Sequence, residues 1–265
     1  AHTDLTVDWI EFRNMSADQI DLGGLYLSDH YNNPFRYLMP VGTVVPANGF
    51  LGLSTTNFGF AFSELGSDIL LLQSSGTNII RFMDTVNIPA SDREESLGIF
   101  ALSDGDTDFT ELRANTEGSA NALPRVVPVV MSAIMYKQAA NQSEFVELVN
   151  ISHTNVLLYD PVFPTNTWQL GGGVSFSLPM GLQLLPGAVA IVCATNPATF
   201  RAQYGVSAAI PVYGPWSGAL NNAGDSIKLL RPGDPETNGF IPYYRVDHLR
   251  YEPNSPWPSE AAGGV

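Results

Sequence analysis

The sequence predicts an all-β protein made of two tandem β-sandwich domains joined by a short linker. Three observations lead to this prediction. Short apolar runs of strand length recur along the chain, turn residues separate them, and one pattern of side chains occurs twice. Runs in this rhythm are typical of sandwiches or barrels and not of βαβ units.

The expected strands are rich in β-branched and aromatic residues, which suit a half-buried pleated surface. In chain order they are Trp9–Phe12, Leu25–Leu27, Phe50–Leu53, Ile69–Leu72, Asn78–Phe82, Phe145–Val149, Val189–Cys193 and Ile227–Leu230. Turn sequences such as Leu185-Pro186-Gly187 lie between them and supply the backbone angles that turns need. One short helix is expected, with Asn196 as its cap, Pro197 at its first position and Gly205 as its stop.

The chain contains an internal repeat. The segment 9–16 matches 145–152, the segment 44–46 matches 184–186, and the segment 66–72 matches 224–230. Each copy is long enough to bury its own core. The predicted domains are therefore residues 1–122 and 128–265, with the linker between them.

Two polar residues recur within the first matched segment. Glu11 corresponds to Glu147, and Asn14 corresponds to Asn150. Recurrence in both copies indicates a structural role, and we expect hydrogen bonds that fix the transition from strand to turn.

The ordered motifs resemble the lamin tail domain, an immunoglobulin-like β-sandwich that is common in exported bacterial proteins. The closest likeness lies in Val130–Tyr136, Glu144–Asn150 and Tyr251–Pro258, and in Leu22–Asp29 of the first copy. The resemblance implies two immunoglobulin-like sandwiches. It also implies that the first copy begins at the second strand and that the second copy is truncated at its C-terminal strand. The family supplies no shared catalytic residues.

Composition and charge narrow the function classes. The chain has 12 basic and 26 acidic residues, a net charge of −14, and residues 1–124 contain 5 basic and 17 acidic residues, which gives −12. A nucleic-acid partner is not expected, because such binding needs a basic surface. Membrane insertion is not expected either, because no apolar run approaches the ~20 residues of a transmembrane helix. The single cysteine, Cys193, excludes an internal disulfide framework.

One candidate metal site stands out. Asp104, Asp106 and Asp108 alternate, and Glu111 follows, at a spacing that resembles calcium loops. The glycine and glutamate positions of an EF-hand do not match. A solvated acidic hairpin tip is therefore the simpler interpretation, and calcium is the only cofactor that the sequence suggests.

One candidate ligand site is aromatic. Tyr213, Trp216, Tyr251 and Trp257 could stack on sugar rings if they are exposed. The alternative is that they fill the core, as most aromatic residues do. No catalytic signature is present, and Cys193 is expected to be an inert buried thiol.

These observations predict a protein that is not an enzyme. We expect a structural, adhesion or protein-interaction module of a larger exported bacterial protein, at the cell surface or outside the cell, with an export signal outside this sequence. Its partner would be a protein or a polysaccharide, and an unpaired strand edge could recruit it. The alternative is an accessory glycan- or calcium-binding module attached to an enzyme elsewhere in the parent chain.

Overall fold

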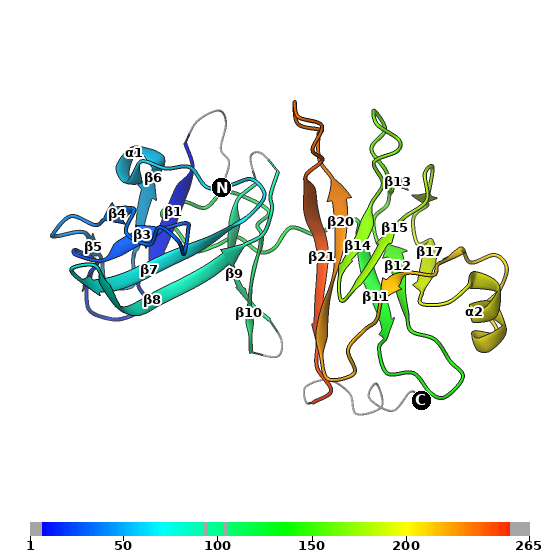
Figure 1. Cartoon of the computed structure of the whole chain (residues 1–265). Helices are drawn as coiled ribbons and strands as arrows, with labels where there is room; N and C mark the ends of the chain where they lie inside the picture. The colour runs from blue at the N-terminus through cyan, green and yellow to red at the C-terminus, as the bar shows by residue number, and fades with distance from the viewer. Residues whose placement is uncertain (1–6, 93–94, 103–104, 255–265) are drawn as a thin grey trace. The chain divides into compact units, whose positions relative to one another are not determined.

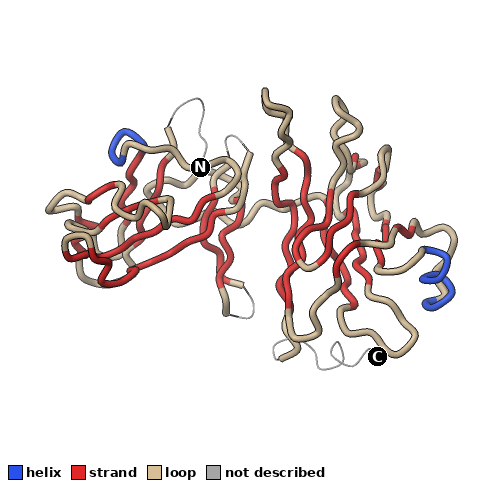
Figure 2. The backbone as a smooth tube through the Cα atoms, viewed as in Figure 1, coloured by secondary structure: helices blue, strands red, loops and turns tan. Residues whose placement is uncertain are grey.

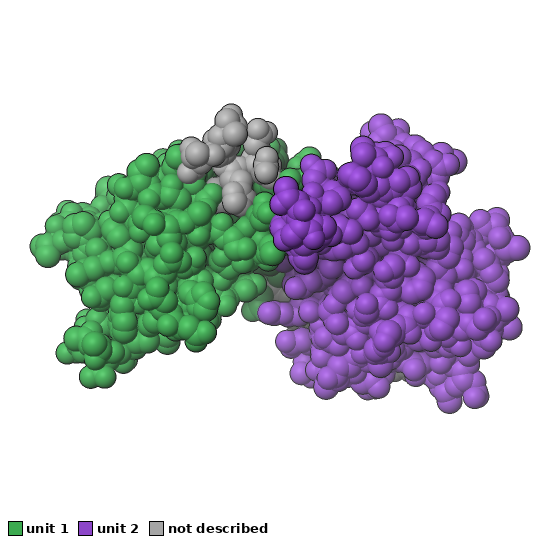
Figure 3. All heavy atoms as spheres, turned by 45° about the horizontal axis from the view of Figure 1, so that its top comes forward, with its two compact units in different colours: residues 1–126 green, residues 127–265 purple. Residues whose placement is uncertain are grey.

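The structure is a computed structural model that describes residues 7–92, 95–102 and 105–254. Strands account for 43% and helices for 5% of the chain, which confirms the all-β class (Figures 1 and 2). The chain divides into two compact units, residues 1–126 and 127–265 (Figure 3). That these units fold as the two predicted domains stays a prediction.

The first unit is built on one four-stranded sheet and three strand pairs. The sheet has the order β4-β3-β7-β8, and the pairs are β1-β6, β2-β5 and β9-β10. The elements are β1 (Trp9–Arg13), β2 (Ile20–Asp21), β3 (Tyr26–Ser28), β4 (Tyr37–Leu38), β5 (Val44–Val45), β6 (Phe50–Ser54), α1 (Thr55–Phe58), β7 (Ser67–Ser75), β8 (Asn78–Ile88), β9 (Leu97–Ala101) and β10 (Thr107–Glu111).

The core of the first unit lies under the four-stranded sheet. Leu27 and Leu71 lie directly opposite each other on β3 and β7, and both belong to this core. Phe58, Phe60 and Phe62 join them, with ring centroids 4.8–5.8 Å apart. The sequence reading missed α1, which brings the first of these rings inward.

The second unit consists mainly of two sheets. Their orders are β11-β12-β17-β18 and β19-β15-β14-β20-β21, with the extra pair β13-β16. The elements are β11 (Val129–Met135), β12 (Phe145–Asn150), β13 (Val156–Leu157), β14 (Gln169–Gly172), β15 (Val174–Ser177), β16 (Gln183–Leu184), β17 (Val189–Cys193), α2 (Pro197–Tyr204), β18 (Val212–Tyr213), β19 (Ser217–Gly218), β20 (Asp225–Pro232) and β21 (Tyr243–Tyr251).

Both sheets of the second unit contribute to one core. Val146 and Leu148 come from the first sheet, and Leu170, Ile227 and Leu229 from the second. The alternation of buried and half-buried residues along β12 is that of a strand with one face on a core.

The predicted helix is confirmed as α2. The Asn196 side chain accepts the backbone N–H of Ala198 at 2.9 Å, and Gly205 ends the helix in the left-handed conformation at φ 65°. Phe200 and Tyr204 lie on one face of the helix and pack against Phe145, with ring centroids 5.3 Å from it.

The internal repeat is visible in the strand pairing. β1 corresponds to β12, β6 to β17, β7 to β20 and β8 to β21. One detail of the sequence alignment was wrong by a residue. Val45 corresponds to Leu184, not to Leu185, because the carbonyl groups of these two residues accept from the equivalent side chains Asn14 and Asn150.

Candidate interaction surface

The recurring asparagines tie each strand to the turn that follows it. Asn150 is fully buried, and its amide donates to the carbonyls of Thr154 and Leu184, each at 2.8 Å. Its oxygen accepts the N–H of Ser152 at 2.9 Å. Asn14 makes the same contacts with Asp18, Val45 and Ser16 in the first unit. The structural role predicted for this pair is confirmed.

The recurring glutamates, in contrast, have different partners. The Glu11 carboxylate accepts the backbone N–H of Gly118 at 2.5 Å, whereas Glu147 accepts the hydroxyl of Ser132 at 2.7 Å. Burial raises the pKa of Glu11, and the bond from Gly118 partly offsets this effect. The two residues therefore stabilise local structure, each in its own way.

A second side-chain to backbone hydrogen bond recurs in both units and was not predicted from the sequence. Asp8 and Glu144 directly precede the equivalent strands β1 and β12, and both side chains are buried. Asp8 accepts the backbone N–H of Phe62 at 2.7 Å, and Glu144 accepts that of Leu220 at 3.0 Å. The aspartate and glutamate side chains differ in length by one methylene group, so a comparison of residue types in the sequence does not reveal that the two positions are equivalent. Burial raises the pKa of Glu144.

Among the predicted acidic residues that the structure describes, Asp106, Asp108 on β10 and Glu111 form no metal site. Asp104 lies outside the described residues, and Asp106 lies in the hairpin tip. Glu111, on β10, forms an ion pair with Arg125. Within the described ranges, no three His, Cys, Asp or Glu side chains are grouped so that they could hold a metal ion. The solvated hairpin tip and calcium binding both stay predictions.

The predicted aromatic ligand residues that the structure describes do not form an exposed platform. Trp216 and Tyr251 are buried in the core of the second unit, and Tyr213 is half-buried on its margin. Trp257 lies outside the described residues. Because a sugar ring stacks only on an exposed aromatic face, Trp216 and Tyr251 cannot supply one in this structure. The core interpretation holds for these two residues.

Cys193 is fully buried at the end of β17. Its Sγ atom lies 3.2 Å from the carbonyl oxygens of Thr195 and Tyr213. Burial raises the pKa of this thiol. A thiol that is buried and protonated is a poor nucleophile, which agrees with the inert role expected for it.

The most unusual surface of the first unit is strand β8. Its eleven residues form one end of the four-stranded sheet, and β7 is its neighbour in the sheet. Four large apolar side chains of β8 are between 39% and 58% exposed; we call Ile79, Ile80, Phe82 and Met83 the apolar strip. Soluble proteins usually protect an edge strand by short length, charged side chains, proline or β-bulges. Strand β8 is long and has no lysine or proline, but it carries Arg81, Asp84 and two register shifts.

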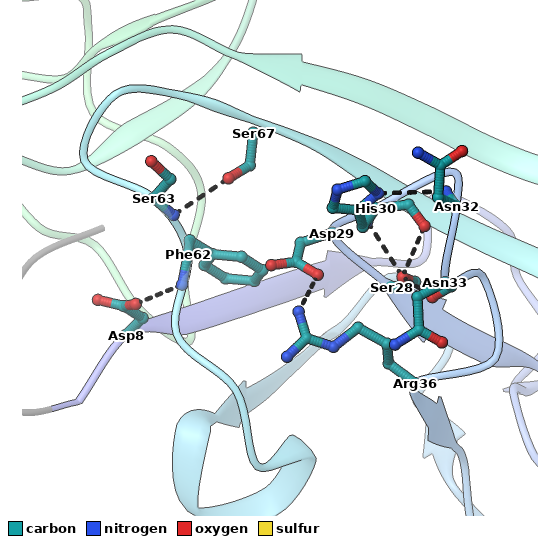
Figure 4. Close-up of polar contacts among 10 residues, drawn as sticks. All are labelled: Asp8, Ser28, Asp29, His30, Asn32, Asn33, Arg36, Phe62, Ser63 and Ser67. Atoms are coloured by element: carbon teal, nitrogen blue, oxygen red, sulfur yellow. Dashed lines mark hydrogen bonds and ion pairs between the residues drawn. The ribbon is translucent and has the colours of Figure 1, made fainter.

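A structured loop lies beside the apolar strip. Asp29 and Arg36 form an ion pair that closes residues 29–36, and the Ser28 hydroxyl donates to the carbonyl of Asn33 at 2.7 Å (Figure 4). The guanidinium of Arg36 lies 4.1 Å from the ring centroid of Phe60. This loop holds Tyr31, which is 53% exposed, edge-on to Phe82 with centroids 6.0 Å apart.

The corresponding strand of the second unit is covered. Residues of β21 are mostly half-buried or buried, and strand β11 runs next to it. The backbone N–H of Met131 on β11 donates to the carboxylate of Asp247 on β21 at 2.7 Å. The two units thus differ in the exposure of this strand, since β8 has four exposed large apolar side chains and β21 is mostly buried or half-buried.

The comparisons with known proteins are negative. No family model matches the chain. No curated protein matches it either. None of the described helices is long and apolar enough to cross a membrane. The lamin-tail assignment therefore stays a prediction.

Proposed function

We propose that the chain is a non-catalytic protein-interaction module, built of two lamin-tail-like units, within a larger exported bacterial protein that acts outside the cell. The observation that carries this proposal is the apolar strip on the long edge strand β8. Such an edge offers backbone N–H and C=O groups for pairing together with apolar side chains for contact.

The surroundings of the strip support a binding role. Tyr31 extends the apolar surface, and the Asp29–Arg36 ion pair and the Ser28 bonds hold its loop in place. Large apolar groups on a preformed surface are the usual anchors of protein interfaces, because ordering costs little on binding.

The test is binding to a panel of extended peptides with alternating apolar residues. We expect the full chain to bind members of the panel and the Phe82→Lys variant to bind them about tenfold more weakly, a typical effect for an interface anchor. Ile99→Lys is the matched control, because Ile99 is 50% exposed on β9 of the same unit. It should leave binding unchanged.

Two results would contradict the proposal. One is that no peptide binds. The other is equal loss of binding in the Phe82→Lys and Ile99→Lys variants, because binding would then follow overall charge and not the apolar strip.

A further inference from the structure

The apolar strip lies on the part of β8 whose outer edge is open. Residues 78–85 are all exposed, and β7 is the only strand that β8 pairs with in the part of the chain that the structure describes. The other end of β8 is covered, because Val86 and Ile88 pack with Phe109 of β10 on the core of the first unit. The edge that a partner could pair with is therefore residues 78–85.

The two charged residues of β8 are placed symmetrically about Phe82. Along the ladder with β7, Asp84, Phe82 and Arg81 occupy three successive positions. Met83, between the first two, is the extra residue of a register shift. Because successive positions of a ladder face opposite sides of the sheet, Arg81 and Asp84 share one face and Phe82 lies on the other.

Neither charged side chain has an ion-pair partner among the described residues. The Nε atom of Arg81 donates to Oε1 of Gln73, an uncharged side chain on the same face, at 3.1 Å. The Asp84 side chain is exposed, and no hydrogen bond joins its carboxylate to another described residue. A strand that pairs along this edge can supply opposite charges to both residues.

We propose that the partner of the apolar strip is a second copy of this chain, whose β8 pairs antiparallel with β8 of the first copy around a two-fold axis at Phe82. In this register, Arg81 of each copy lies opposite Asp84 of the other. Such an interface is isologous, which means that one surface patch contacts itself. This proposal rests on the proposed function and specifies its partner.

The charges select this register. Moving the axis one step along β8 would place Asp84 opposite Asp84 in one direction and Arg81 opposite Arg81 in the other. Like charges directly opposite each other destabilise a strand pair, whereas opposite charges stabilise it. The charges that discourage general pairing of this edge therefore favour a partner with the same two charges in reverse order, and an antiparallel β8 is such a strand.

The apolar side chains support a two-fold contact at Phe82. Ile79 and Phe82 share one face, since their partners on β7 are two residues apart. Tyr31 lies edge-on to the Phe82 ring. Around the axis, the two Phe82 rings lie next to each other, and these side chains of one copy shield those of the other from water.

Strand β21 of the second unit does not carry this pattern. Its ladder shifts register at the same place in the repeat, after Leu229. Asp247 therefore takes the position of Asp84. Tyr244, however, takes the position of Arg81. The complementary charges are thus not required by the fold, and the contact is expected at the first unit alone.

Overall charge limits the strength of the dimer. Each copy has a net charge of −14, which opposes association. The contact itself is neutral, because Arg81 and Asp84 are the only charged residues of β8. The contact is also smaller than the roughly 800 Å² per partner of a standard interface, since one strand supplies most of it. We therefore expect a weak, transient dimer.

The test is analytical ultracentrifugation of the full chain from about 10 µM to about 1 mM, the range of weak complexes, at about 0.15 M salt. We expect a monomer–dimer equilibrium. Arg81→Asp places acids opposite each other, and Asp84→Arg places bases opposite each other. Each should weaken the dimer at least about tenfold. Because the two substitutions move the net charge in opposite directions, a loss in both cannot come from overall charge.

An equimolar mixture of these two variants is the decisive sample. Each chain then meets the opposite charges on the other, so a heterodimer should form although neither variant associates alone. The double variant Arg81→Asp/Asp84→Arg should dimerise like the parent. Since mixing does not rescue a misfolded chain, the heterodimer also shows that both variants fold.

Two matched controls make the same charge changes elsewhere on the first unit. Arg113→Asp and Asp18→Arg lie at exposed sites and should leave dimerisation unchanged. Hydrogen exchange at high concentration should protect residues 78–85. A chain that stays monomeric to about 1 mM, a mixture without heterodimer, or protection confined to another strand would overturn the assignment.

The outcomes separate the two proposals. If the chain stays monomeric while peptides bind in a manner that depends on Phe82, the second copy is the wrong partner and the interaction module stands. If no dimer forms and no peptide binds, both proposals fail.

Discussion

Buried polar side chains at repeated positions hold each unit together at its strand ends. Asn14 and Asn150 satisfy backbone groups that would otherwise be buried without partners, and Asp8 and Glu144 do the same for one N–H each. Leaving such a group unsatisfied costs about 1–3 kcal/mol. This cost explains why these residues recur while the sequence around them varies.

The pH dependence of the second unit should reflect Glu144. Burial raises its pKa above the usual value of 4.5. The folded unit then binds a proton more readily than the unfolded chain, so its free energy of unfolding falls as the pH rises from about 4.5 through the raised pKa. Glu144→Gln keeps an acceptor for the Leu220 N–H and removes the titration.

We therefore expect the Glu144→Gln variant to be more stable than the parent at pH 7 and to lose this advantage near pH 4.5. Urea unfolding between pH 4 and pH 8 measures the difference. Glu252→Gln, at an exposed glutamate of the same unit, should show no such trend. A stability advantage that grows toward acid would mean that the charged Glu144 stabilises the fold.

At the scale of single elements, the strands were predictable because short apolar runs of strand length lie between turn residues. The runs at Phe145–Val149 and Val189–Cys193 became paired strands, and the caps at Asn196 and Gly205 located α2. An acidic hairpin tip was expected between β9 and β10, but neither strand was among the predicted apolar runs, because polar and acidic residues interrupt their pattern. The uncovered edge of β8 could not be read from the sequence, because it depends on which strand lies beside it in space.

Glycines at strand ends allow close backbone approach, and two of them make a matched pair. Gly172 ends β14 at φ 101°, where an added Cβ would lie 2.2 Å from the carbonyl oxygen of Ser226. Gly181 lies in a turn at φ 74°, with nothing within 4 Å of such a Cβ. Both alanine variants suffer the left-handed backbone, but Gly172→Ala also collides with β20.

We expect Gly181→Ala to lower the free energy of unfolding by about 1–2 kcal/mol. Gly172→Ala should lower it by at least about 2 kcal/mol more, because the backbone of β20 must move. Urea unfolding of the two variants measures the difference. Equal losses would show that β14 and β20 are not packed as closely as the structure has them.

At the scale of the whole molecule, the number of repeats could be predicted from the sequence, but whether each repeat folds independently could not. The repeat at segments 9–16 and 145–152 pointed to two similar units, and the structure has two compact units. Whether each unit folds alone is an energetic question that a repeat pattern does not answer. Equivalent substitutions in the two units can answer it.

Asn14→Ala and Asn150→Ala should each destabilise one unit by about 2–4 kcal/mol, because several hydrogen bonds to buried groups are lost. In a urea titration followed by hydrogen exchange, we expect Asn14→Ala to move the transition of residues 7–126 alone. Asn150→Ala should move that of residues 127–254 alone. A single transition that both variants shift equally would mean that the chain folds as one cooperative body.

The buried Cys193 is a built-in chemical probe for opening of the second unit. An alkylating reagent in solution reaches its sulfur only after β17 separates from its neighbours. Since this is the only cysteine in the sequence, the labelling rate measures how often the second unit opens and does not depend on opening of the first unit. Measuring the labelling rate of Cys193 with and without a ligand bound to the first unit would show whether that binding changes how often the second unit opens.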